Sequence, residues 1–432
     1  MKASGLPFAG DVMNKKKTLC PENLFFFLSL AGILGFFVFA VLKGTDAWLW
    51  MVQENNPEIQ GVDYYMHLSF CVDPERLYEV GEISCFPPFA YIMYRALYLL
   101  SSAGGGDAGP RGWTIFYNSF RYNAVYYAFL TFLALFLLFA IGSVTKGKMK
   151  RREVLLLFFC FFFSAPFIGS GFMVGNSTML IISLLMLALK MRDSRSAAVR
   201  EGALVLIAVC AGFKIYPAIF GLLYLKEKRW KEAVRLIVYG ILVFTVPFAW
   251  FGGMKGFMLW LVHIRDTMGI MNYGRVQFIK GIVYMLLVHL TGSFDSPVIT
   301  AGTTVIPLLF LLLMIILAWF SQDKTRTIFF LISAMVFYPT NAFRYTLGYL
   351  IIPFIFRLTE KESGYTAEDW LNAFFAGMIY TIPMLMGLAT GFVLGFHYFT
   401  MTAVEVWLYC AAYLFVLTEI ILEGAALLRR KV

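Results

Sequence analysis

The side chains best suited to chemistry concentrate between the first two long apolar runs of the sequence. Asp63 is followed by Tyr64 and Tyr65, and His67 stands four positions after it. A carboxylate among aromatic rings loses hydration, and burial raises its pKa toward that of a general base. If the segment is helical, His67 lies on the same face and could orient the acid or bind a substrate. The alternative is a solvated loop acid beside a histidine of no special role.

The composition places these residues in a membrane protein. Of 432 residues, 60% are apolar and 14% are charged, whereas soluble proteins are about 45–50% apolar and about 25% charged. The mean hydropathy is +0.74. The net charge of +10 comes from bases in short loops, as the positive-inside rule predicts, so it implies no nucleic-acid partner. We predict one all-α polytopic domain over residues 1–432, with about 10–12 transmembrane helices.

The distribution of charge predicts which loops face outward. Lys15–Lys17 and Arg429–Lys431 place both termini inside, so the first apolar run, 24–43, leads outward. Residues 44–113 hold nine acids and three bases, a balance typical of an outer loop. Within this loop the short run 87–100 has Arg95 near its middle. We predict that it is an amphipathic helix in the outer interface, opened by Pro87 and Pro88.

The run 202–225 has basic clusters on both sides, so it should enter the membrane and return to the same side. We predict a re-entrant or broken helix pair that turns at Lys214–Pro217. About eleven residues of helix rise ~16 Å, half a bilayer. Non-helical backbone at membrane depth is tolerated only where protein surrounds it or where it lines a water-filled cavity. Counting back from the C-terminus makes 252–298 a second outer loop, with 278–290 as an interfacial helix.

The order of these landmarks resembles the GT-C class of integral-membrane glycosyltransferases. It is closest to family 87, which includes bacterial polyprenyl-phosphate-mannose-dependent mannosyltransferases. The resemblance covers most of residues 20–360. The elements that carry it are Asp63-Tyr64-Tyr65, Phe86-Pro87-Pro88, Gly175-Asn176-Ser177-Thr178, Lys214-Ile215-Tyr216-Pro217 and the turn from Tyr338 to Tyr345. Phe86 stands where the family usually has Tyr, and Asn176 where it usually has Gln. A GT-C-like helical bundle is the fold that this resemblance implies.

The resemblance also implies an inverting sugar transfer at the outer face of a bacterial plasma membrane. Mannose or a similar sugar would pass from a polyprenyl-phosphate donor to a glycolipid or cell-envelope glycan. It favours Asp63 as the base, with Asp46 as the rival; Asp46 could instead anchor the first span beside Trp48. Arg or Lys can stabilise the negative charge that develops on a monophosphate leaving group. The sequence shows no acidic cluster that would bind a metal. We therefore expect no cofactor and no metal.

Three cations are candidates for the donor phosphate. Arg344, at an outer turn with Asn341, is the first choice, and a contact with lipid head groups is its alternative. Arg121 would lie in the membrane core, where a charge costs ~2.5–3.5 kcal/mol or more, so it needs a partner. That partner is either the phosphate or a structural residue such as Asn118 or Asn123. Lys214 lies at the turn of the broken helix pair, which would present it to the donor. That turn is only half a bilayer from the cytoplasmic side, a short distance for contact with a phosphate in the outer leaflet. The predicted substrate site is completed by Tyr64, Tyr65, His67, Asn176, Pro87 and Pro88.

A second function class is open at this stage. A transporter or flippase of a lipid-linked saccharide would usually show inverted repeats and paired broken helices, and only one broken pair and no repeat are visible. A scaffold role in envelope assembly is a third reading. Cys71 and Cys85 both fall in the first outer loop, where a disulfide could form.

Overall fold

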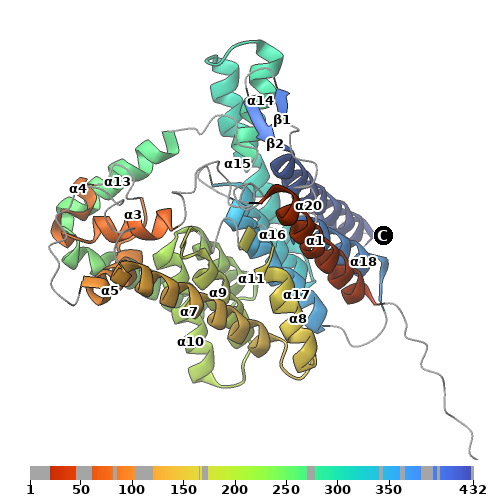
Figure 1. Cartoon of the computed structure of the whole chain (residues 1–432), viewed down its shortest axis with the longest axis horizontal. Coiled ribbons are helices and arrows are strands. Elements are labelled where there is room, and N and C mark those ends of the chain that lie inside the picture. Colours follow the sequence, from red (N-terminus) through yellow and green to blue (C-terminus); the bar gives the residue numbers. More distant parts are fainter. Residues whose placement is uncertain are drawn as a thin grey trace, which may run out of the picture.

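The computed structural model describes residues 20–44, 61–80, 85–102, 120–164, 166–167, 174–269, 278–339, 344–360, 365–380, 393–396 and 399–429. Within these ranges the chain is almost entirely helical (Figure 1). Five helices are long and apolar enough to cross a membrane: Pro21–Leu42, Phe120–Val144, Trp230–Trp250, Pro297–Phe320 and Leu408–Arg429. The prediction of an all-α polytopic membrane protein is confirmed. Other apolar helices fall short of the ~20 residues that a crossing needs, so the number of crossings stays a prediction.

The first helix, α1 (Pro21–Lys43), is followed by the short helices of the first predicted outer loop. These are α3 (Val62–Phe70), η2 (Pro74–Arg76), α4 (Leu77–Val80) and α5 (Pro88–Ser102). The helix predicted at 87–100 is therefore present, and Pro88 is its first residue. Arg95 in its middle donates from Nη1 to the carbonyl oxygens of Cys71, at 2.6 Å, and Val72, at 3.3 Å. Arg95 thus joins α5 to the C-terminal end of α3.

The central helices surround α9 (Thr178–Met191), which packs between α7 (Phe120–Val144) and α10 (Ala197–Phe213). Nearly all of α9 is buried, as expected for a helix that is apolar on every side. The neighbouring elements are α8 (Arg151–Phe162), α12 (Trp230–Thr245) and η5 (Val246–Trp250). On the side away from α9, α10 packs along α12. The start of α9 therefore lies deep among other helices.

The helix over 202–225 is broken at the predicted turn, and its re-entrant path through a membrane stays a prediction. The chain leaves α10 at Lys214, and η4 (Tyr216–Phe220) and α11 (Gly221–Lys226) follow. Pro217 explains the break, because proline lacks the N–H that a continuing helix needs. The predicted length is wrong: α10 has 17 residues, which rise about 25 Å. It begins at Ala197, five residues before the predicted start. Arg200 therefore lies within the helix, where it pairs with Glu232 of α12 at 3.3 Å.

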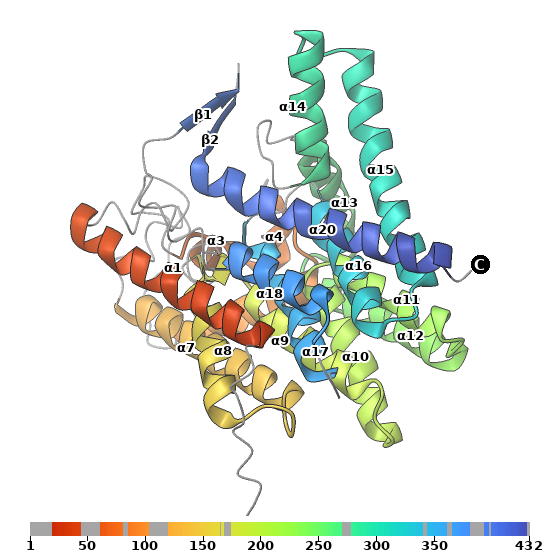
Figure 2. The ribbon, with the colours of Figure 1, turned by 90° about the vertical axis from the view of Figure 1, so that its right-hand side faces the viewer.

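The second predicted outer loop is mostly helical, with α13 (Gly253–Gly269) and α14 (Ile279–Thr291). A helix at 278–290 is therefore present. It does not lie alone, because α14 packs along α15 (Pro297–Phe320) as a helical hairpin. This hairpin extends beyond the rest of the helices in both ribbon views (Figures 1 and 2).

The remaining helices are α16 (Lys324–Phe337), η6 (Arg344–Leu350), α17 (Ile351–Glu360), α18 (Ala367–Tyr380) and α20 (Ala403–Arg429). The C-terminal part of the described chain also contains a two-stranded antiparallel sheet. Its strands are β1 (Val393–Phe396) and β2 (Phe399–Thr402), and Val393 pairs with Thr402. α1 packs against α18, and α18 against α20, on one side of the molecule (Figure 2).

A buried ionic network joins the ends of α16, α17, α18 and α20. Arg326 contacts Glu419 at 3.2 Å and Glu423 at 3.1 Å, and the side chains of both acids are almost completely buried. Arg357 contacts Asp323 at 2.7 Å, and both arginines contact Glu368. Removing one partner from such a buried pair costs about 3–5 kcal/mol, because an uncompensated charge remains. The network therefore stabilises the C-terminal helices against one another.

Candidate functional site

Asp63 lies in the first turn of α3, and the packing of α3 against the start of α9 fixes its place. The N–H of Tyr64 donates to the carbonyl oxygen of Val174 at 3.2 Å. Gly175 has a left-handed backbone, with φ +70°, and a Cβ there would come 2.6 Å from the Cβ of Tyr64. Only glycine fits this position without strain or displacement. This close approach brings the carboxylate of Asp63 to the residue that follows Gly175.

That residue, Asn176, hydrogen-bonds directly to the candidate base. Its Nδ2 donates to Oδ2 of Asp63 at 2.6 Å. Its Oδ1 accepts from the backbone N of Thr178 at 2.9 Å and from Oγ1 of Thr178 at 2.6 Å. A side-chain oxygen that accepts from the N–H two residues on forms an Asx turn, which opens α9 here. The positive end of the α9 dipole therefore lies beside the carboxylate and favours its charged form.

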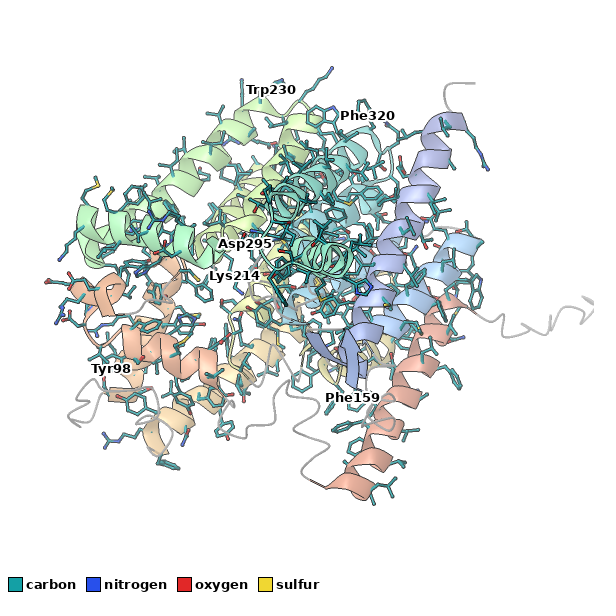
Figure 3. The ribbon with its side chains drawn as sticks, turned by 90° about the horizontal axis from the view of Figure 1, so that it is seen from above. Tyr98, Phe159, Lys214, Trp230, Asp295 and Phe320 are labelled. Carbon is teal, nitrogen blue, oxygen red and sulfur yellow. The ribbon has the colours of Figure 1, made fainter. Side chains whose placement is uncertain are left out.

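Lys214, the first residue after α10, reaches the same cluster from the broken helix. Its Nζ donates to Oδ1 of Asn176 at 3.0 Å and to Oγ1 of Thr178 at 2.9 Å. The ring centre of Tyr345 lies 4.5 Å from Nζ and that of Phe86 lies 5.3 Å away. The side chain is only 5% exposed. Seen from above, Lys214 lies in the middle of the molecule (Figure 3).

An aromatic wall encloses the cluster on the side of α5. The imidazole of His67 stacks on Phe86 with ring centres 4.4 Å apart, and Tyr94 lies 4.8 Å away. Burial, with a smaller contribution from the charge of Lys214, lowers the pKa of His67 to about 3. His67 is therefore neutral, and its Nδ1 is buried without a hydrogen-bond partner among the described residues.

The segment 85–88 that carries Phe86 is held in place by two hydrogen bonds. The hydroxyl of Tyr78 donates to the carbonyl oxygen of Phe86 at 2.9 Å, and Nε1 of Trp260 donates to that of Cys85 at 3.2 Å. Trp260 belongs to α13, so both predicted outer loops contribute to the position of this segment. The disulfide considered for Cys71 and Cys85 is not formed, because both are free thiols.

The electrostatics of Asp63 combine two opposed effects. Burial raises the pKa of Asp63 above its usual value, and the hydrogen bond from Asn176 and the charge of Lys214 lower it in part. Oδ2 is occupied by Asn176, whereas no described residue donates a hydrogen bond to Oδ1. A carboxylate with one oxygen fixed and the other free, and with a raised pKa, has the chemistry of a general base.

The structure brings together eight of the eleven predicted site residues around α3, α5 and the start of α9: Asp63, Tyr64, Tyr65, His67, Pro87, Pro88, Asn176 and Lys214. Tyr64 and Tyr65 pack around Tyr126 of α7, and the hydroxyl of Tyr65 donates to Asn123. Pro87 and Pro88 are buried at the start of α5. Their roles toward a substrate stay predictions.

The other three predicted site residues are Arg121, Arg344 and Asn341. Arg121 is exposed in the first described turn of α7, and its contact with the phosphate or with a structural partner stays a prediction. Asn123, considered as that partner, instead accepts from Tyr65. Arg344 begins η6, next to Tyr345, and its side chain lies outside the described residues. Asn341 and the rival base Asp46 also lie outside them.

Sequence reasoning missed Thr178, Phe86 and Tyr345 as members of the site. Thr178 carried a signal, because Asn-x-Thr at the start of an apolar helix is the pattern of an Asx turn. The contacts of Phe86 and Tyr345 with Lys214 join residues more than a hundred positions apart, and no local pattern predicts them.

Comparison with known families settles the class of protein. The model of glycosyltransferase family 87 matches residues 110–343. The chain belongs to glycosyltransferase family 87. The matched range includes Asn176, Thr178 and Lys214, whereas Asp63 precedes it. No curated protein and no solved structure matches the chain. This family-87 protein is thus a glycosyltransferase and a multi-pass membrane protein, and the resemblance drawn from its motifs is confirmed.

Proposed function

We propose that this family-87 protein is an inverting glycosyltransferase that uses a polyprenyl-phosphate sugar. The sugar is mannose or a similar one, and the acceptor is a hydroxyl of a glycolipid or cell-envelope glycan at the outer face of a bacterial plasma membrane. Both chain termini then lie in the cytoplasm. The observation that carries the proposal is the Asp63 carboxylate, fixed through one oxygen by Asn176.

The reaction is a single displacement at the anomeric carbon. Oδ1 of Asp63 accepts the proton of the acceptor hydroxyl while the hydroxyl oxygen bonds to the anomeric carbon. The bond from that carbon to the phosphate oxygen breaks, and its electron pair leaves with polyprenyl phosphate. Attack from the face opposite the leaving group inverts the configuration. General-base catalysis of this kind contributes typically ~10²–10⁴-fold to the rate.

The departing phosphate needs cationic hydrogen-bond donors. Arg344 remains the residue that we propose to bind this phosphate. The next residue, Tyr345, lies against Lys214 and so places the start of η6 at the edge of the site. The Arg344 guanidinium can bind a phosphate through two parallel hydrogen bonds. Tyr64, Tyr65 and the neutral ring of His67 are buried and exclude water around Asp63.

The test is sugar transfer by purified protein in proteoliposomes. Polyprenyl-phosphate mannose and related donors are supplied in labelled form together with envelope lipid extract. We expect transfer by the wild type and loss of at least 100-fold in Asp63→Asn. Asp73→Asn is the matched control, since Asp73 is an exposed acid of the same segment, and it should transfer normally. Wild-type protein that transfers nothing but moves labelled lipid between leaflets would instead identify a flippase.

A further inference from the structure

Lys214 is poorly placed to be a ligand of the donor phosphate. An ammonium group has three N–H donors, and two of them are directed to Asn176 and Thr178. The faces of Phe86 and Tyr345 cover the group further, and 5% of the residue is exposed. A phosphate would have to displace these contacts to reach Nζ. The hydrogen bonds point to a different role.

We propose that Lys214 and Thr178 are positioning residues that act on Asp63 through the side-chain amide of Asn176. The proposal rests on the proposed function, in which Asp63 is the base. It assigns no contact with the donor to Lys214. Its structural basis is a continuous chain of hydrogen bonds from the broken helix, through the start of α9, to the carboxylate on α3.

The amide of Asn176 can face Asp63 with either its nitrogen or its oxygen, and only the nitrogen gives an attractive contact with a carboxylate. The orientation of such an amide is set by its hydrogen-bond partners. Here Oδ1 receives three donors, Nζ of Lys214, the N–H of Thr178 and Oγ1 of Thr178. All three favour the orientation in which Nδ2 donates to Asp63. Lys214 and Thr178 therefore lock the amide as a donor.

The charge of Lys214 has a second effect on the same carboxylate. Burial favours the protonated acid, and the nearby cation favours the carboxylate that a base requires. Among the described residues, the other titratable groups that face Asp63 are Cys85, Tyr94 and Tyr345. These are neutral in their protonated forms and supply no compensating positive charge. Without Lys214, Asp63 should bind its proton more tightly.

The experiment measures the protonation of Asp63 directly and the pH dependence of transfer in the same variants. An infrared titration follows the carboxyl band that disappears in Asp63→Asn, and sugar transfer gives kcat/KM against pH. In Lys214→Met we expect the Asp63 titration and the acid limb of kcat/KM to move up by about one pH unit. The KM for the donor should change less than threefold.

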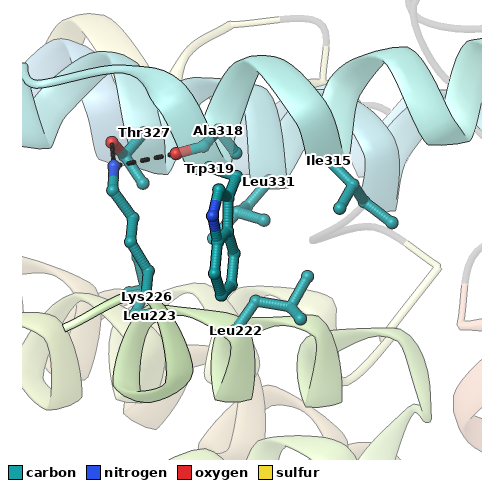
Figure 4. Close-up of a pocket in the computed structure, with 8 residues that line it drawn as sticks. All are labelled: Leu222, Leu223, Lys226, Ile315, Ala318, Trp319, Thr327 and Leu331. Carbon is teal, nitrogen blue, oxygen red and sulfur yellow. Dashed lines mark hydrogen bonds between the residues drawn. The ribbon is translucent and has the colours of Figure 1, made fainter. Parts of the chain in front are cut away.

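Three further variants separate positioning from general damage. Thr178→Val should lower kcat several-fold, and Thr178→Ser, which retains the hydroxyl, should restore it. Lys226→Met is the matched control. Lys226, like Lys214, directs its Nζ to oxygen atoms of the protein, but at the end of α15: it donates to the carbonyl oxygen of Ala318 and to Oγ1 of Thr327 (Figure 4). It also donates to the carbonyl oxygen of Ser321. This substitution should lower thermal stability and leave the Asp63 titration unmoved.

The outcomes distinguish this proposal from the proposed function. An Asp63 titration that does not move in Lys214→Met overturns the positioning role, whether or not the protein transfers sugar. A large rise in donor KM with an unmoved titration would make Lys214 a phosphate ligand instead. If the titration moves but the wild type transfers nothing from any donor, the positioning stands and the proposed function fails.

Discussion

Gly175→Ala tests whether sugar transfer depends on the close packing of α3 against the start of α9, apart from the effect of backbone strain on stability. Gly175 adopts φ +70°, and an L-residue in this left-handed conformation costs about 1–2 kcal/mol. The new Cβ would also come 2.6 Å from the Cβ of Tyr64. Relieving that contact requires α3 to move by about 1 Å, and a misplacement of this size can cost ~10²-fold in rate. We expect transfer to fall about 100-fold.

Gly147→Ala is the matched control for this change. Gly147 has φ +78°, and a Cβ there would meet nothing within 4 Å. It should show the strain of the backbone without the displacement of α3, so its melting temperature falls modestly and its transfer stays within twofold of wild type. Both variants are compared by thermal unfolding in detergent and by transfer in proteoliposomes. Near-normal transfer by Gly175→Ala, or an equal loss in Gly147→Ala, would refute the reasoning.

Two further predictions concern pH and stability. Burial raises the pKa of Asp63, and the base must be deprotonated to act. We therefore expect kcat/KM to fall as the pH drops through this raised pKa. A kcat/KM profile that is flat down to about pH 4, the region of an ordinary Asp, would contradict this prediction. Arg326→Met removes the cation that pairs with Glu419 and Glu423 and should destabilise the protein by about 3–5 kcal/mol. Arg265→Met breaks an exposed pair and should change stability little, which thermal unfolding of both variants will check.

The sequence predicted the parts of the fold that depend on local patterns. Apolar runs located most helices, Pro87 and Pro88 located the start of α5, and Pro217 located the break after α10. Charge patterns predicted helix boundaries less accurately where charged side chains pair with one another between helices. The basic cluster before residue 202 was interpreted as a flanking loop, but Arg200 in it belongs to α10 and pairs with Glu232 of α12. The short sheet at β1 and β2 followed a run that has the composition of a transmembrane helix.

The site was predictable to the extent that motifs carried it. Asp63, Asn176 and Lys214 were each singled out, although local spacing did not show that one hydrogen-bond chain joins them. That chain depends on the contact of Gly175 with Tyr64 and on the full length of α10, which are tertiary features. Lys214 was expected to bind phosphate because the broken helix pair presents it at its turn. The hydrogen bonds to Asn176 and Thr178 and the packing of Phe86 and Tyr345 around Nζ occupy the group that was to contact the phosphate.

The most direct test of the central claim is sugar transfer by Asp63→Asn in protein that is folded and binds its donor. Asparagine keeps the size of the side chain and removes the carboxylate that accepts the proton. The account predicts wild-type transfer from a polyprenyl-phosphate sugar and, in the variant, a loss of at least 100-fold in kcat with an unchanged melting temperature. Transfer by the variant at a rate close to wild type would show that Asp63 is not the base.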